Sequence, residues 1–474
     1  MKAIKRAFSL LLCLALLCAV VALGAQAKEK SCGCGVVPTI WVPGIGGGFI
    51  VDYGTAQQRS IGMMDEDRGA EEWIKDLLPV LTNVIAAAAT QSWDKGADAL
   101  HALGFGLLGH LQMDERGQSV YPVTMRATVN PAQDHTQNRH YQFDYDWRAD
   151  PMQTAAALND YVAQVKKATG HKQVILEADS EGGLIVMAYF AQFGYADVEH
   201  FISRFCAHHG VSMVGELLNG NIALTAPLAK EYATNLLRVM TPDTAKLLPL
   251  IDFLAKTKLL DVLVNALSMI VKNTAYKLYT ETLIPLAAQW PALWGFVPDE
   301  YYESAKKLML SDPKYDDFKK MIDNFHYKAG SQKADKLIKD ANKVMKVSII
   351  ASYGFPIIPL TPNVGTDTDA LIDTARESCG ATTAGYGNTF AADYAQKKND
   401  GHNHISPDNR VDASTCLLPD QTWFIKYAPH FTPDHYAFFD FLYDSKRQPT
   451  VFTDAEFPQF MTRQADGTFI PTAP

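Results

Sequence analysis

In the first half of the chain, segments with the alternating apolar pattern of strands are separated by segments with the apolar spacing of helices. Residues 141–147 alternate as a strand does, and short apolar runs predict further strands at 173–178 and 199–206. Helical spacing over residues 181–194 separates the last two strands. Strands and helices in alternation predict an α/β fold in which helices cover both faces of a mostly parallel sheet.

A second helix in this region has clear boundary signals. Asp150 is a typical N-cap, Pro151 suits the first helical turn because its missing N–H has no partner there, and Gly170 ends the pattern. The apolar side chains that share one face of this helix are Leu158, Tyr161, Val162 and Val165.

The alternation is interrupted by a long helical stretch. Residues 212–340 have helical apolar spacing and no convincing strand, whereas strand character returns at 347–352 and 422–427. A short apolar strand at 39–42 comes first, and a helix is expected after Pro433. These patterns predict a sheet-containing core whose chain is interrupted by a helical insertion.

The first 27 residues have the pattern of a cleaved export signal. A basic start (Lys2, Lys5, Arg6) precedes an apolar run at 8–23 and a small-x-small site at 25–27. A lipidated Cys18 is the alternative, but Leu17 is too large for that cleavage. We therefore expect residues 1–27 to be a signal peptide, 28–211 and 341–474 to form the two parts of the core, and 212–340 to form a lid or cap.

Net charge argues against one class of partner. The formal charge is −9, and loss of three basic residues with the signal would make it about −12 (−9 − 3). An acidic chain without a basic cluster is not typical of a nucleic-acid-binding protein.

Five cysteines would remain after cleavage. Export permits disulfides, and Cys379–Cys416 is the first pairing expected because both residues belong to the late loop region. Cys32 and Cys34 are too close in sequence to bridge each other easily. The cysteine spacing fits no common zinc pattern, so no metal site and no cofactor are expected.

The segment VILEADSEGG, residues 174–183, carries the strongest chemical signal. An apolar strand, a Ser in a tight turn and two glycines opening a helix form the pattern of a nucleophile elbow. Small residues are needed two positions before and after the nucleophile, and Ala178 and Gly182 fit this around Ser180. An elbow centred on Asp179 would require a small residue at 177, where Glu177 stands. Ser180 is therefore the predicted nucleophile.

A serine nucleophile needs a base and an orienting acid, which follow it in the order acid, then His, in this type of fold. His430 directly follows the strand at 422–427 and is the predicted base, with His435 in reserve. Asp408 is the favoured acid and Asp412 the alternative. Chain order disfavours His402 and His404, and His208 and His209 are expected to line a loop.

An oxyanion formed by attack needs backbone N–H donors. We expect one from Glu181, next to the nucleophile, and one from Ile45 in the glycine-rich loop PGIGGG after the first strand. The same loop could instead cradle a phosphate, but it lacks the glycine spacing and the GK[ST] of nucleotide-binding loops.

Several separated motifs resemble those of lecithin:cholesterol acyltransferase-like enzymes and related bacterial lipases. They are WVPGIGG, YDWR at 145–148, the elbow, YGFP at 353–356 and DASTC at 412–416. The resemblance implies an α/β-hydrolase fold with a lid, a Ser-Asp-His triad and acyl-ester substrates, often lipids. The chain departs from that family at Ala178-Asp179, where Gly-His is usual, and at Glu181. These carboxylates would oppose an anionic transition state unless they turn away or pair with a base, and Arg148 is expected to pair with a carboxylate near the site mouth.

The leading interpretation is an exported carboxylic ester hydrolase or acyltransferase. Trp294 and Phe296, in the apolar stretch PALWGFVP, are predicted to contact the acyl chain, with transient contact to a membrane or lipid surface. The alternative is a non-catalytic protein that binds a lipid or glycan on a hydrolase scaffold. The sequence leaves open the head group, the acyl length and the oligomeric state.

Overall fold

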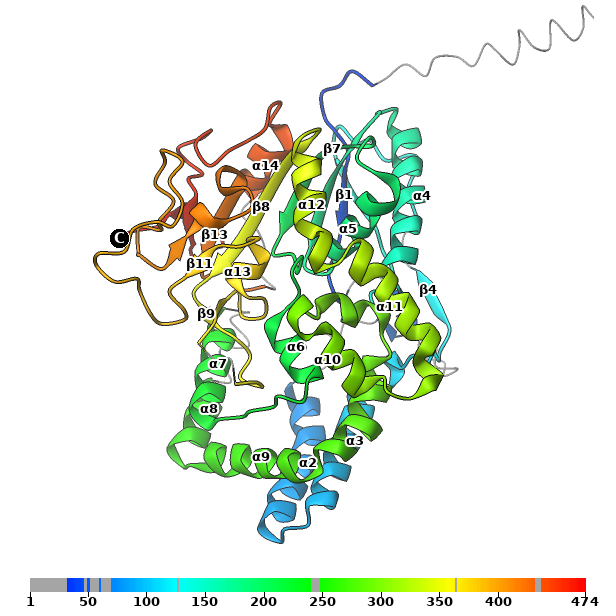
Figure 1. Cartoon of the computed structure of the whole chain (residues 1–474), viewed down its shortest axis with the longest axis vertical. Helices are drawn as coiled ribbons and strands as arrows, with labels where there is room; N and C mark the ends of the chain where they lie inside the picture. The colour runs from blue at the N-terminus through cyan, green and yellow to red at the C-terminus, as the bar shows by residue number, and fades with distance from the viewer. Residues whose placement is uncertain are drawn as a thin grey trace, which may run out of the picture.

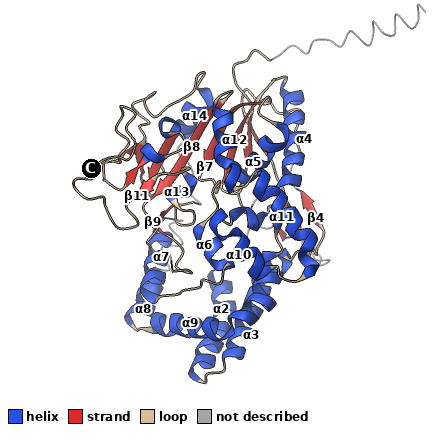
Figure 2. Cartoon of the chain, in the orientation of Figure 1, coloured by secondary structure: helices blue, strands red, loops and turns tan. Residues whose placement is uncertain are grey.

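The computed structural model describes residues 32–46, 49–51, 59–60, 70–125, 128–239, 248–362, 365–430 and 436–474. The expected signal peptide and His435 lie outside these residues. An eight-stranded sheet occupies the upper half of the view, and a body of helices extends below it (Figure 1; Figure 2).

Neighbouring strands of the central sheet run parallel to each other, except that the strand at one edge is antiparallel to its neighbour. The fold is therefore α/β, as the alternation of strands and helices predicts. In spatial order the strands are β15 (Phe469–Pro471), β14 (Phe460–Arg463), β13 (Thr422–Lys426), β8 (Lys346–Tyr353), β7 (Val198–Arg204), β6 (Val174–Asp179), β1 (Thr39–Val42) and β5 (His140–Gln142).

Alternate side chains of each strand serve the two faces of the sheet. In β6, Leu176 joins a core cluster with α4 (Pro151–Thr169), α5 (Gly182–Phe193) and α12 (Ser331–Asn342). Its neighbour Ile175 joins the opposite cluster with α14 (Tyr436–Asp444). Helices thus cover both faces of the sheet. Only the ends of the parallel strands remain available to form a binding site.

The helical body combines two parts of the sequence. Helices α2 (Ala70–Ala89) and α3 (Trp93–Leu108) pack against α9 (Leu259–Leu278) around a small core that includes Val84, Ala97 and Ile270. The remaining elements of this body are α6 (Ser212–Leu218), α7 (Ala226–Val239), α8 (Leu248–Lys256), η3 (Tyr279–Ala288), η4 (Pro291–Phe296), α10 (Asp299–Met309), η5 (Pro313–Tyr315) and α11 (Asp316–Lys328).

The shorter elements lie in the loops. Beyond the central sheet, β2 (Phe49–Val51), β3 (Arg59–Ser60) and β4 (Val123–Met125) form one small sheet, and two pairs of strands form two others. The pairs are β9 (Phe355–Pro356) with β10 (Asp367–Thr368) and β11 (Thr382–Thr383) with β12 (Val411–Asp412), and the short helical turns are η1 (Gly109–Leu111), α13 (Thr374–Glu377), η6 (Ala413–Thr415) and η7 (Pro419–Gln421).

Two sequence expectations differ from the structure. The strand expected over 141–147 is confined to β5 because the following residues turn into a polar corner that is described below. Cys379 and Cys416 are both buried free thiols rather than a disulfide, although the N–H of Leu417 bonds the carbonyl of Cys379 at 2.9 Å. Within the described residues, no helix combines the length and the apolar character that a bilayer crossing requires.

Candidate active site

Ser180 occupies a strained turn at the carboxyl end of β6. The strand ends at Asp179, and α5 begins at Gly182, so Ser180 lies between the two elements. Its φ angle is +52°, in the left-handed region that non-glycine residues rarely adopt. Backbone strain of this kind concentrates at functional sites, and this geometry matches the nucleophile elbow that the sequence predicts.

Three glycines allow the turn to pack tightly. A Cβ on Gly44, just after β1, would lie 2.6 Å from the Cβ of Ser180. A Cβ on Gly182 would meet the carbonyl oxygen of Val42 at 2.0 Å, and one on Gly183 would meet the Cβ of Cys206 at 2.5 Å. The glycine-rich loop and the elbow are therefore in contact, which brings together two motifs that are far apart in the sequence.

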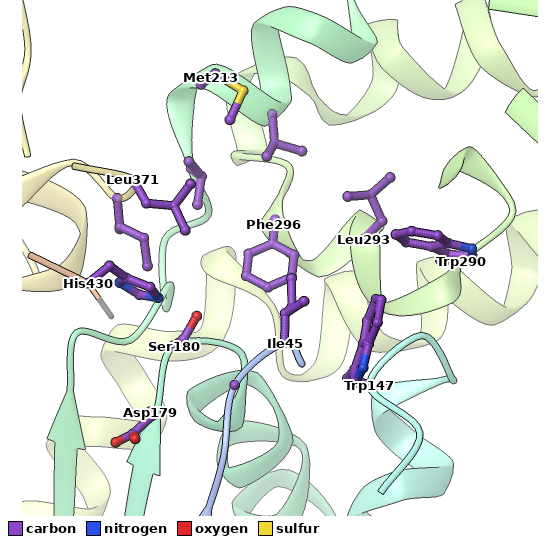
Figure 3. Close-up of a pocket in the computed structure, with 14 residues that line it drawn as sticks. Ile45, Trp147, Asp179, Ser180, Met213, Trp290, Leu293, Phe296, Leu371 and His430 are labelled. Atoms are coloured by element: carbon purple, nitrogen blue, oxygen red, sulfur yellow. The ribbon is translucent and has the colours of Figure 1, made fainter. Parts of the chain in front are cut away.

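His430 follows β13 and lies beside Ser180 at the edge of a cavity (Figure 3). Its Nδ1 atom is 2.5 Å from Oδ2 of Asp369, and its backbone N–H donates to the carbonyl of the same residue at 2.9 Å. The other carboxylate oxygen of Asp369 accepts hydrogen bonds from the N–H groups of Leu371 and Ile372, at 2.8 and 2.6 Å. Asp369 is fully buried, so this carboxylate is fixed in orientation and in turn fixes the imidazole.

The prediction that Asp408 partners His430 is wrong. Asp408 forms an ion pair with Lys426 at 2.9 Å, and Asp412 accepts from the N–H groups of Ser414 and Lys397. The position expected for Asp408 is taken by Asp369, which comes earlier after β8. Chain order alone allowed both residues, and no signal in the sequence separates Asp369 from Asp367 and Asp373 in the same connection.

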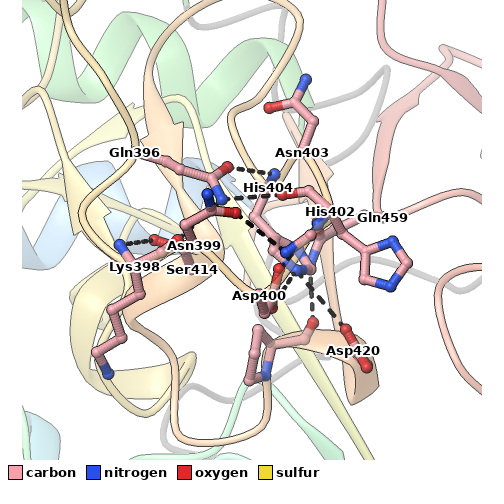
Figure 4. A network of polar contacts seen from close by, with 12 residues as sticks. Gln396, Lys398, Asn399, Asp400, His402, Asn403, His404, Ser414, Asp420 and Gln459 are labelled. Carbon is pink, nitrogen blue, oxygen red and sulfur yellow. Dashed lines mark hydrogen bonds and ion pairs between the residues drawn. The ribbon is translucent and has the colours of Figure 1, made fainter.

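The other candidate histidines of the described chain have different surroundings. His404 is buried, with Nδ1 2.8 Å from Gln459 and Nε2 2.9 Å from Asp400, in the polar network of Figure 4. Burial lowers the pKa of His208 to about 3, and its ring contacts Ser203. His209 contacts Asp335 at 2.8 Å. None of these three rings lines the cavity at Ser180.

The cavity at Ser180 has a volume of about 350 Å³ and a mostly apolar lining. A cavity of this size that is lined by apolar groups and few polar ones is typical of a small-molecule site. Figure 3 shows Phe296 above Ser180, with Leu293 and Trp290 beyond it. The lining residues are Gly44, Ile45, Trp147, Asp179, Ser180, Val211, Met213, Val214, Trp290, Leu293, Phe296, Leu371, Ile372 and His430.

Of the two predicted acyl-contact residues, Phe296 lines the cavity and Trp294 does not. Trp294 is 1% exposed and packs in the core of the helical body, where its Nε1–H donates to the carbonyl of Ala288 at 2.9 Å. Both residues belong to η4, whose tight turn directs neighbouring side chains to different sides. Trp290 precedes η4 and Leu293 belongs to it. Both line the cavity, and the sequence pattern did not single out either of them.

The environments of the two carboxyl groups beside Ser180 both reduce the effect of negative charge there. Asp179 is bound by the guanidinium of Arg204, and it accepts from Trp41 Nε1 at 2.8 Å. Glu181 is fully buried, and neither of its oxygens has a hydrogen-bond partner among the described residues. Burial, and secondarily the charge of Asp146, raises the pKa of Glu181 well above its ordinary value. This shift favours the protonated, neutral form of the Glu181 carboxyl group.

The YDWR segment forms a polar corner between the elbow region and the helical body. The Tyr145 hydroxyl donates to the carbonyl of Pro43 at 2.5 Å. The Arg148 guanidinium bonds both oxygens of Asp146, at 2.9 and 2.8 Å, and also the carbonyl of Leu111 at 2.9 Å. Trp147 lines the cavity and meets the ring of Trp290 edge-on at 5.3 Å. Arg148 pairs with a carboxylate as expected, and its guanidinium is fully buried.

Two groups of described side chains have the residue types of metal ligands, and neither lines the cavity. Asp400, His404 and Asp420 form the first group, which belongs to the network of Figure 4. Cys32, Cys34, His135 and His171 form the second.

Comparison with known proteins adds little to this geometry. No protein-family model and no curated protein matches the chain. One similar solved structure is the crystal structure of the Tle4-Tli4 complex. It is 12% identical in sequence, the match covers 67% of this chain and 75% of that chain, and the TM-score is 0.29.

Proposed function

We propose that the protein is a serine hydrolase that cleaves carboxylic esters through a triad of Ser180, Asp369 and His430. The observation that carries this proposal is the alignment of a strained serine, an adjacent histidine and a buried, doubly anchored aspartate at one apolar cavity. This arrangement supplies a nucleophile, its base and an orienting acid.

The proposed reaction begins when the Ser180 hydroxyl attacks the ester carbonyl. His430 takes the serine proton at Nε2, because Nδ1 is engaged by Asp369. The backbone N–H groups of Ile45 and Glu181 would stabilise the oxyanion. His430 then returns the proton to the leaving alcohol, and an acyl-enzyme remains. Water, activated by the same histidine, releases the acid and restores the serine.

The raised pKa of Glu181 weakens an objection to this chemistry. A charged carboxylate next to the nucleophile would oppose the oxyanion and would favour a non-catalytic binding protein. Burial favours the neutral form of Glu181, and Arg204 balances the charge of Asp179. The carboxyl substitutions at the elbow are thus compatible with catalysis.

The apolar cavity favours an acyl chain as the bound group, and lipids as the substrate class. The helical body over the cavity would act as the lid or cap that the resemblance to lecithin:cholesterol acyltransferase-like enzymes implies. Transfer of the acyl group to an alcohol would use the same residues as hydrolysis. Export by the signal at 1–27 is part of this proposal.

An exposed apolar surface on α8 and α9 supports contact with a lipid interface. Leu259, Val262 and Met269 fall on one side of α9 by helical spacing, and Tyr276 follows a kink at Thr274. These four residues are between 43% and 82% exposed. Phe253 of α8 is 56% exposed. Exposed apolar residues that gather on one face are typical of interaction surfaces. We call these five residues the α8–α9 apolar surface.

Hydrolysis of p-nitrophenyl esters from acetyl to palmitoyl, by the mature protein and by Ser180→Ala, tests the proposal. We expect activity with an optimum that reports the acyl length, and its loss in the variant. A serine-reactive fluorophosphonate probe should label the wild-type protein and not the variant. A folded protein without turnover or labelling would instead indicate the binding function.

A further inference from the structure

Four potential metal ligands meet at the amino ends of the parallel strands, whereas Ser180 lies at the carboxyl end of β6. The Sγ atom of Cys34 lies 3.3 Å from Nε2 of His135 and 3.4 Å from Nε2 of His171. The Sγ atom of Cys32 lies 3.6 Å from the same nitrogen of His135. All four ligand atoms lie within 4.8 Å of one another. Two thiols and two imidazoles therefore face a common point.

The topology of the sheet explains why these residues meet. Cys32 and Cys34 precede β1, His135 precedes β5, and His171 precedes β6. These three strands are parallel neighbours in the order β5, β1, β6, so the segments before them share one edge of the sheet. The N–H of Cys32 also donates to the carbonyl of Gly170 at 2.9 Å, next to His171. Ser180 lies at the opposite edge, after the carboxyl end of β6.

The distances match those of a tetrahedral metal centre. With metal–sulfur bonds of about 2.3 Å and metal–nitrogen bonds of about 2.0–2.1 Å, a tetrahedral angle separates sulfur from nitrogen by about 3.5 Å. The three sulfur–nitrogen separations of 3.3, 3.4 and 3.6 Å bracket this value. Hydrogen bonds within the cluster would account for individual contacts, but not for four donor atoms converging on one point.

We propose that Cys32, Cys34, His135 and His171 bind one zinc ion. Sulfur and imidazole nitrogen in equal number form a ligand set that zinc prefers in structural sites. Binding would displace one proton from each thiol, and the two thiolates then balance the charge of the ion. The sequence spacing gave no sign of this site because half of its ligands come from two other segments of the chain.

The site has a structural role in this proposal. Four protein ligands complete a tetrahedral shell and leave no position for substrate or water. The ion would fasten the segment before β1 to the starts of β5 and β6, close to where the mature chain begins if the predicted signal is removed. The effect is to stabilise the folded chain without taking part in chemistry at Ser180.

The test begins with the mature protein, reduced and freed of metal, and then supplied with Zn²⁺ or Co²⁺ alone. We expect about one ion per chain by elemental analysis. Co²⁺ should give the intense visible bands of a tetrahedral site together with a thiolate charge-transfer band. Removal of Zn²⁺ by a chelator should lower the melting temperature by about 5 °C or more, since a ligand that binds the folded state stabilises it.

Variants show whether the ion binds at this cluster or at another part of the chain. Cys34→Ser and His135→Ala should lose the ion, whereas His135→Cys should retain it with a changed Co²⁺ spectrum. His402→Ala, at an exposed histidine outside the cluster, is the matched control and should bind like the wild type. His135→Cys also covers the case in which the other two variants fail to fold, because binding by a folded His135→Cys protein with the altered spectrum supports the site.

Three results would overturn the proposal. The first is a fully reduced wild-type protein that binds no ion. The second is binding that survives in Cys34→Ser, and the third is a Co²⁺ spectrum without thiolate bands, which would place the ion elsewhere, for instance at Asp400 and His404. Ester hydrolysis below the melting temperature should be unchanged by metal removal, so this test stands apart from that of the proposed triad.

Discussion

His430 and Asp369 are joined twice, by a 2.5 Å contact between Nδ1 and Oδ2 and by a 2.9 Å bond between their backbones. The second bond makes the pair a rigid unit, since the aspartate positions both the loop and the ring. The imidazole orientation is therefore set before any substrate binds, which is the arrangement that a triad requires.

This pairing predicts opposite outcomes for two aspartates that follow β8. Asp369→Asn should lower kcat by about 10⁴-fold, because the amide cannot stabilise the imidazolium and favours the wrong tautomer. Asp408→Asn breaks an ion pair with Lys426, and neither residue lines the cavity, so kcat should stay within about threefold of the wild type. Steady-state kinetics on one soluble ester decides between them. Equal losses in both variants would exclude Asp369 as the specific partner of His430.

The pH dependence of stability should report the buried Glu181. Its raised pKa means that the folded chain keeps a proton that the unfolded chain releases above about pH 4.3. The contribution of this group to stability is therefore full at low pH, and it falls by about 1.4 kcal/mol per pH unit until pH passes the folded-state pKa.

Glu181→Gln removes that dependence. Urea unfolding of both proteins between pH 5 and pH 8 should show the variant gaining on the wild type as pH rises, while ester hydrolysis persists because the proposed oxyanion donor is a backbone N–H. Glu456→Gln, at an exposed position, is the control for loss of a carboxylate. A stability difference that does not change with pH would mean that Glu181 is ionised in the folded protein.

The contact between Gly44 and the elbow predicts a sharp effect of one methyl group. Gly44→Ala places a Cβ 2.6 Å from that of Ser180, so the loop and the nucleophile must move apart. We expect kcat to fall about 10²-fold, since displacements near 1 Å have effects of that size. Gly106→Ala is the control, because it lies in α3 with open space around it and should raise stability by about 0.5–1 kcal/mol. An unchanged kcat in Gly44→Ala would show that the position of this loop does not affect the reaction.

Neighbouring aromatic residues in η4 should respond differently to mild substitution. Phe296→Leu reshapes the cavity, and the ratio of long-chain to short-chain kcat/KM should change about three- to tenfold. Trp294→Phe affects the core of the helical body, so it should cost about 2 kcal/mol of unfolding free energy and leave that ratio unchanged. An equal loss on all chain lengths in Phe296→Leu would contradict a role in acyl binding.

The α8–α9 apolar surface predicts a difference between dispersed and soluble substrates. Val262→Glu with Met269→Glu should reduce hydrolysis of an ester presented in vesicles by about tenfold, and should leave a short soluble ester unaffected. Val344→Glu, at an apolar residue that is 67% exposed outside this surface, controls for added charge. If the control reduces vesicle hydrolysis as much, the effect is one of net charge rather than of docking.

Local rules accounted for the parts of the site that a single segment determines. Asp150 caps α4 by accepting from the N–H of Met152 at 2.9 Å, and Gly170 ends that helix with φ of +69°. The elbow at Ser180 followed in the same way from the small residues around it. In each case the residues near a position determine the backbone geometry at that position.

Parts of the site that depend on distant segments were not accessible in this way. Asp369 belongs to a long connection after β8, and only the folded chain shows which of its carboxylates reaches His430. Trp294 and Phe296 have the same local sequence character, but packing of η4 against the core assigns them opposite surroundings. The Cys32, Cys34, His135 and His171 cluster likewise exists only because β5, β1 and β6 are neighbours in the sheet.

The polar corner at residues 145–148 has a consequence for how this architecture could be altered. Tyr145 holds the loop that follows β1, and the carbonyl of Arg148 accepts from the N–H of Ala292 in η4 at 3.2 Å. The roof of the cavity and the loop beneath it are thus fastened to the same four residues. A chimera that exchanged the helical body for that of another protein would loosen the glycine-rich loop after β1 unless it also transplanted this corner. Any redesign of the cavity would therefore have to treat the roof, corner and loop as one exchangeable part.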